Sequence, residues 1–232
     1  MEALHFKTLT KHKMADTVTP VGLYLRLRDK YHNTLLLESS DYHSKEDSFS
    51  FICVEPVVSM KADNNEFSIA VRGEEIERAT IDSNFNSLFN DFASKIHLDC
   101  EAAIQPFNGL YGYTTYDSVQ YFETITLNVK EAPSAIPHMQ YSFYKFIIAI
   151  NHFNDELILI ENLEAGQSSR IDQIETIIET QSFNTQKFDI HGEETSNCTD
   201  ADFKEYVRKA KTHCKRGDVF QLVLSRQFQQ EF

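Results

Sequence analysis

The chain has 232 residues, enough for a buried core and for roughly one and a half domains of average size. It is 41% apolar and 25% charged, which is ordinary for a globular protein and excludes intrinsic disorder. Its 22 basic and 35 acidic side chains give a net charge of −13. A chain this acidic repels phosphate, so nucleic acids and anionic membranes are not expected as partners.

The sequence predicts a cytoplasmic protein with reduced thiols. The longest wholly apolar run is Phe146–Ile150, far short of the twenty or so residues of a membrane span, and the N-terminus lacks the apolar core of a signal peptide. The four cysteines (Cys53, Cys100, Cys198 and Cys214) form no C-x-x-C pair. Cys198 and Cys214 lie at the two ends of one predicted helix, too far apart for a disulfide.

The first half of the chain predicts one helix followed by strands. Pro20 suits a first helical turn, so we expect a helix over Pro20–Tyr31. Apolar runs and alternating patterns then predict strands at Thr34–Glu38, Ser48–Met60, Phe67–Val71 and Glu75–Thr80, with a turn at Arg72-Gly73. Pro56 is expected to mark an edge or a break of its strand.

The middle of the chain combines two amphipathic helices with a hairpin. Apolar residues spaced at i, i+3, i+4 and i+7 predict a helix over Asn84–His97. The segment Tyr141–Leu163 predicts two strands joined at His152–Asp155, and four isoleucines predict a helix over Ile171–Ile178.

The last fifty residues predict a linker and then a new domain. Gln181–Cys198 is polar and has no sustained periodicity, which is typical of a linker. Thr199 then caps a helix that Gly217 ends, and a strand is expected over Val219–Phe228. One helix and one strand cannot bury a core of their own, so we expect them to begin a second domain.

Few residue patterns point to chemistry. The nine histidines have no metal-site spacing, and no glycine-rich phosphate loop is present. Gly109 and Gly112 are best explained by a tight strand crossing that leaves no space for a Cβ atom. Glu38-Ser39-Ser40-Asp41, at the exit of an apolar strand, offers groups that could bind the ammonium of a small amine. On composition alone, an ordinary polar strand end is the simpler interpretation.

An ordered set of motifs resembles anthranilate synthase component I, a chorismate-utilising family. The motifs are Thr19-Pro20-Val21 with the helix that follows, Leu36-Leu37-Glu38-Ser39, Ser50-Phe51-Ile52, Pro106-Phe107-Asn108-Gly109 through Tyr121-Phe122-Glu123, and Gly217-Asp218-Val219-Phe220-Gln221 through Ser225. The last motif is shared with aminodeoxychorismate and isochorismate synthases. Leu36–Ser39 followed by the Ser50 strand favours the anthranilate enzyme.

The resemblance implies a lyase that makes anthranilate and pyruvate from chorismate and ammonia. It also implies a glutamine amidotransferase partner (component II), feedback inhibition by tryptophan and a Mg²⁺ cofactor. Because the family's catalytic residues and metal ligands lie downstream of Phe232, none is assigned to this chain, which is expected to be inactive alone. By resemblance, tryptophan would contact Glu38 and Ser39, and Ser50 on the adjacent strand.

The expected fold is α+β, with antiparallel, sandwich-like sheets, flanking helices, and the first helix and strand of a truncated chorismate-binding domain. Residues 1–195 would form the regulatory domain and residues 196–232 the start of the chorismate-binding domain. The alternatives are aminodeoxychorismate synthase component I and a non-catalytic tryptophan-sensing module.

Overall fold

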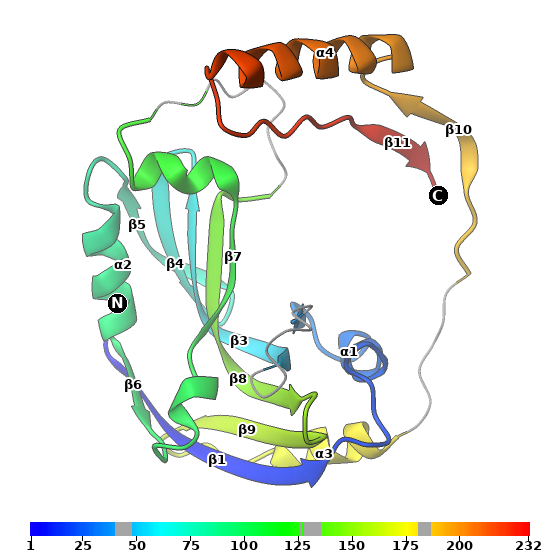
Figure 1. Ribbon diagram of the computed structural model, residues 1–232. Helices are drawn as coiled ribbons and strands as arrows, with labels where there is room; N and C mark the ends of the chain where they lie inside the picture. The colour runs from blue at the N-terminus through cyan, green and yellow to red at the C-terminus, as the bar shows by residue number, and fades with distance from the viewer. Residues whose placement is uncertain (40–47, 126, 128–135, 181–186) are drawn as a thin grey trace. The chain divides into compact units, whose positions relative to one another are not determined.

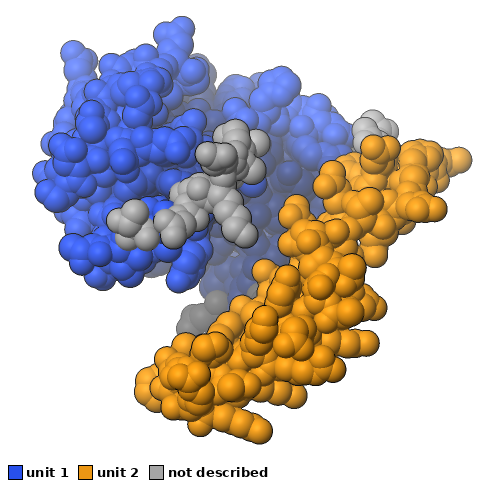
Figure 2. All heavy atoms as spheres, turned by 90° about the horizontal axis from the view of Figure 1, so that it is seen from above, with its two compact units in different colours: residues 1–184 blue, residues 185–232 orange. Residues whose placement is uncertain are grey.

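The chain divides into two compact units, residues 1–184 and 185–232 (Figure 2). The computed structural model describes residues 1–39, 48–125, 127, 136–180 and 187–232. The expected domain boundary between residues 195 and 196 lies inside the second unit. The assignment of a regulatory and a chorismate-binding domain stays a prediction.

The first unit is built on a nine-stranded sheet (Figure 1). Its path runs β5-β4-β3-β8-β9-β1-β6, with β2 added to β3 and β7 added to β8. The strands are β1 (Leu4–Met14), β2 (Leu35–Glu38), β3 (Phe49–Asp63), β4 (Glu66–Val71), β5 (Glu74–Thr80), β6 (Ile96–Asp99), β7 (Leu110–Thr114), β8 (Met139–Asn151) and β9 (Glu156–Glu164). Only β1 and β6 pair in parallel among the described strands, so the expected α+β class with antiparallel pairing is confirmed.

The two longest strands, β3 and β8, pair with each other and each holds two shorter partners on its other edge. β3 pairs with β2 near its start and with β4 near its end, and a bulge at Glu55–Val57 separates the two. Pro56 lies in this bulge, next to Glu55 in the left-handed region at φ 58°. Pro56 therefore marks the expected break in the regular ladder, as a bulge at a point of β3 that pairs with neither β2 nor β4, while the strand itself continues.

The strand β8 changes partners in the same way. Its first residues pair with β7 and its last six with β9. At the change, the carbonyl of Tyr144 accepts a hydrogen bond from Asn162 Nδ2 at 3.0 Å. Asn162 and Asn108, both buried, exchange two further amide hydrogen bonds of 2.8 and 2.9 Å. The two buried amides thus satisfy each other's hydrogen bonds at the point where β8 changes its partner from β7 to β9.

Among the described residues of the first unit, three α-helices cover the sheet: α1 (Pro20–Arg28), α2 (Phe85–Ser94) and α3 (Ile171–Glu179). Leu23 and Leu27 of α1 and the isoleucines of α3 share a core with Ile52 and Phe146, whereas Phe85 and Phe92 of α2 belong to a second core. The expected extension of α2 to His97 is wrong. Ile96 and Leu98 instead enter β6 and pack on the α2 core from the sheet.

The second unit contains β10 (His191–Ser196), α4 (Asp200–Arg216) and β11 (Phe228–Glu231). The predicted cap at Thr199 and end at Gly217 are confirmed: Thr199 forms a capping box with Asp202, and Gly217 is left-handed at φ 78°. Two expectations fail: the presumed linker contains β10, and residues 219–227 form no strand. Among the described residues of this unit, β10 pairs only with β11, so residues 219–227 have no strand to pair with.

Candidate functional site

The strand exit singled out in the sequence lies at the end of β2. Glu38 is the register partner of Ser50 on β3, and the Ser39 amide donates to the Phe49 carbonyl at 3.3 Å. The side chains of Glu38 and Ser39 are exposed. Ser40 and Asp41, the other half of the predicted notch, lie outside the described residues. The ladder therefore brings together the three residues that the sequence nominated.

Ser50 differs from its two companions because it is fully buried. Its hydroxyl lies 2.7 Å from Nε2 of His152, in the turn between β8 and β9. The amide of His152 also donates to the Ser48 carbonyl at 2.9 Å, which fixes the turn against β3. The sequence placed His152 in a hairpin turn and gave it no role, since 102 residues separate it from Ser50.

Apolar side chains line the same face of the sheet beside this polar group. Register partners on antiparallel strands share a face, so Leu36, Ile52, Ile150 and Leu157 lie on the face of Glu38 and Ser50. All four belong to or pack against the core under α1 and α3. A carboxylate, an imidazole and a hydroxyl thus lie at the edge of a buried apolar core, where Leu36 is partly exposed. This combination suits a small molecule that has an ammonium group and an apolar body.

Comparison with known proteins identifies the family. The model of the chorismate binding enzyme family matches residues 33–232. The chain belongs to this family. The earlier resemblance to anthranilate synthase component I, carried by the ordered motifs, is confirmed by the similarities that follow.

The chorismate binding enzymes most similar in sequence include two named anthranilate synthase component 1. The protein of Lactococcus lactis is 28% identical over 96% of this chain and 49% of its own length. That of Acetivibrio thermocellus is 27% identical over 94% of this chain and 47% of its own length. The crystal structure of anthranilate synthase component I from Streptococcus pneumoniae matches 93% of this chain and 48% of that chain, with a TM-score of 0.55 and 20% identity, which shows a shared fold. The chain spans about half the length of the relatives it matches.

Residues of the Pro106–Glu123 motif stretch make contacts within the sheet of the first unit. Asn108 belongs to the buried amide pair. A Cβ atom on Gly112 would lie 1.9 Å from the carbonyl oxygen of Gln140 on β8, so the predicted close strand crossing is confirmed there. Gly109 has no atom within 4 Å of such a position and needs no glycine for space. The hydroxyl of Tyr121 lies 2.7 Å from His138 Nδ1.

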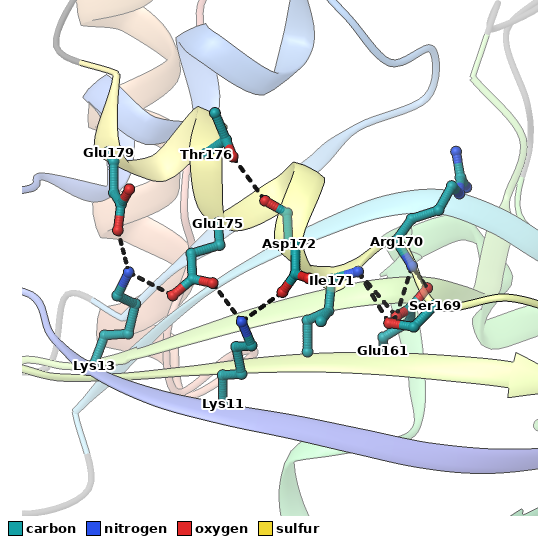
Figure 3. A network of polar contacts seen from close by, with 10 residues as sticks. All are labelled: Lys11, Lys13, Glu161, Ser169, Arg170, Ile171, Asp172, Glu175, Thr176 and Glu179. Atoms are coloured by element: carbon teal, nitrogen blue, oxygen red, sulfur yellow. Dashed lines mark hydrogen bonds and ion pairs between the residues drawn. The ribbon is translucent and has the colours of Figure 1, made fainter.

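Polar contacts secure α3 at its start (Figure 3). Glu161 of β9 is fully buried, and its carboxylate accepts hydrogen bonds from the Ser169 hydroxyl at 2.5 Å and from the amides of Arg170 and Ile171 at 2.9 and 3.1 Å. These are amides that a helix start leaves without partners. A side chain from the sheet therefore caps α3 where Arg170, at the cap position, does not.

A ladder of ion pairs joins the same helix to β1 (Figure 3). Lys11 contacts Asp172 and Glu175, and Lys13 contacts Glu175 and Glu179 at 2.7 and 2.5 Å. These hydrogen bonds lower the pKa of the Glu175 carboxyl and raise the pKa of Lys13. Lys11 and Lys13, two residues apart on β1, thus contact one face of α3. This helix covers the core next to the end of β2.

Other features of the described residues do not coincide with the nominated site. A groove of about 740 Å³ at the β3 bulge is lined by Tyr31, Glu55, Lys61 and Arg72 among others, but by none of the nominated residues. Within the described part of the chain, no three His, Cys, Asp or Glu residues are placed to hold a metal ion. In that same part, no helix is long and apolar enough to cross a membrane.

Proposed function

We propose that this chain is the N-terminal half of an anthranilate synthase component I. The complete protein would convert chorismate and ammonia to anthranilate and pyruvate, with ammonia supplied from glutamine by a component II partner. The observation that carries the proposal is the match over 96% of the chain to half of a protein with that name. The four free thiols suit the cytoplasm, where we place the protein.

The part of this function that we assign to the described residues is tryptophan binding at the β2 exit. The Glu38 carboxylate would accept hydrogen bonds from the α-ammonium, and the Ser39 hydroxyl would bind beside it. The partly exposed side chain of Leu36, at the edge of the core, would contact the indole ring. Ser50 remains a proposed contact, although its buried hydroxyl is already engaged by His152.

We assign no catalytic residue to this chain. The Mg²⁺ implied for the family would assist loss of the chorismate hydroxyl. The described residues do not fit such a site, because they gather no set of three metal-ligating side chains. The ion and its ligands are therefore proposed for the remainder of the complete protein, and this chain alone is proposed to be inactive.

The test is an assay of the complete protein with chorismate, ammonium and Mg²⁺, followed by anthranilate fluorescence and product chromatography. Anthranilate formation that tryptophan inhibits is expected. Glu38→Ala should raise the tryptophan concentration for half-inhibition about tenfold or more, the loss expected for a hydrogen bond to a charged group. Glu74→Gln, which alters another exposed carboxylate at the start of β5, should leave it unchanged. Aminodeoxychorismate as product, or tryptophan binding without turnover, would refute the proposal in favour of the corresponding alternative.

A further inference from the structure

His152 is an exposed imidazole fixed by a buried hydroxyl. Its Nε2 lies 2.7 Å from Ser50 Oγ, and Ser50 has no accessible surface. A ligand at the strand exit therefore meets the imidazole before it meets Ser50. The other ring nitrogen, Nδ1, makes no hydrogen bond to any side chain or backbone group in the described part of the chain, and it remains available to a ligand.

The position of the proton in the hydrogen bond between Ser50 and His152 determines whether Nδ1 of His152 is a donor or an acceptor. A buried hydroxyl needs an acceptor for its proton, and among the described residues Nε2 of His152 is the partner that Ser50 has. If Ser50 donates to Nε2, the neutral imidazole carries its own proton on Nδ1. Nδ1–H is then a donor.

We propose that His152 binds the carboxylate of the amino acid at the strand exit through Nδ1–H, and that Ser50 is the residue that positions the imidazole. This inference rests on the proposed tryptophan site and adds a specificity-determining residue to it. The site then has an acceptor on β2 and a donor in the turn between β8 and β9, with Ser50 of β3 between them. Glu38 accepts from the ammonium group, and His152 donates to the carboxylate.

Register supports this division of roles. Glu38 and Ser50 are cross-strand partners, so their Cβ atoms are separated by about 5 Å on the same face, and His152 contacts Ser50 directly. An α-amino acid carries its ammonium and its carboxylate on one carbon atom, so an acceptor and a donor that both lie next to Ser50 can bind the two groups of one ligand. A donor is needed here, because a protein with a net charge of −13 otherwise repels a carboxylate.

Two ligands that differ by one carboxylate test the inference: L-tryptophan and tryptamine, titrated calorimetrically into the complete protein. His152→Ala should weaken tryptophan binding roughly 10- to 100-fold, the loss of one hydrogen bond to a charged group, and leave tryptamine binding unchanged. His152→Gln, whose amide can still donate, should recover part of the loss. Ser50→Ala should weaken tryptophan less than His152→Ala does, and the double variant should match His152→Ala alone.

His97→Ala is the matched control, since it removes an exposed imidazole that stacks on His5 at the far edge of the sheet. It should change neither affinity. If His152→Ala weakens tryptamine as much as tryptophan, or leaves tryptophan binding intact while Glu38→Ala abolishes it, the inference is overturned and the proposed site stands. If the unaltered protein binds neither ligand, the proposed site and the inference fail together.

Discussion

Replacing Gly112 by alanine tests the most sharply defined contact of the fold. The new Cβ would lie 1.9 Å from the carbonyl oxygen of Gln140 and 2.7 Å from the Cα of Tyr141, both backbone atoms of β8. To restore an ordinary contact of 3.4 Å, the oxygen would have to retreat by about 1.5 Å, which breaks the pairing of the five-residue β7. Overpacking usually costs about 1–3 kcal/mol, and because backbone must move here we expect about 3 kcal/mol or more.

The assay is urea unfolding followed by circular dichroism, with Gly109→Ala as the control. With a slope of about 2–3 kcal/mol per molar urea, Gly112→Ala should lower the midpoint by about 1–1.5 M. Gly109 has open space and no left-handed φ, so its alanine variant should remain within about 0.5 kcal/mol of the original. Equal stability of the two variants would refute the steric argument.

Three further predictions concern α3 and the thiols. Glu161→Ala should lower the free energy of unfolding by about 2–4 kcal/mol, because buried donors lose their acceptor, and Glu161→Gln by less, as thermal melts can measure. The pKa of the Glu175 carboxyl is lowered from 4.5, so its stabilisation is complete above that pH and is lost as the pH falls through the lowered value. Urea titrations below pH 4.5 should therefore show a steeper loss in the original protein than in Glu175→Gln. A thiol reagent should label exposed Cys214 in the folded protein but Cys53 only after unfolding, because burial raises the pKa of Cys53; labelling of folded Cys53 would contradict this.

Strong apolar patterns were sufficient to predict most of the sheet, but β1 was missed for a physical reason. Lys11 and Lys13 occupy the face of β1 that should be apolar, and they form ion pairs with carboxylates of α3 while staying partly exposed. Leu9 packs into the core from the same face. The apolar–polar alternation of β1 disappears because Lys11 and Lys13, on its inner face, are paired charges. The position of this strand is therefore explained by its contacts with α3.

The sequence predicted only those residues of the candidate site that lie close to one another along the chain. Glu38 and Ser39 follow an apolar strand, and Ser50 lies on the next one, so their proximity follows from a hairpin-like pairing. His152 joins them through the register of β3 with β8, which no local pattern specifies. The strand predicted over Val219–Phe228 is absent at residues 219–227, because an apolar composition does not by itself supply a partner strand.

The central pairing of β3 with β8 also constrains how the protein is made. Residue 49 pairs with residue 151, so the ladder closes a loop of about a hundred residues, and such long-range contacts form slowly. On a ribosome, the edge of β3 that pairs with β8 stays unpaired until β8 has been synthesised. During that interval the open edge can pair with other chains, so this segment is exposed to aggregation while the chain is being made.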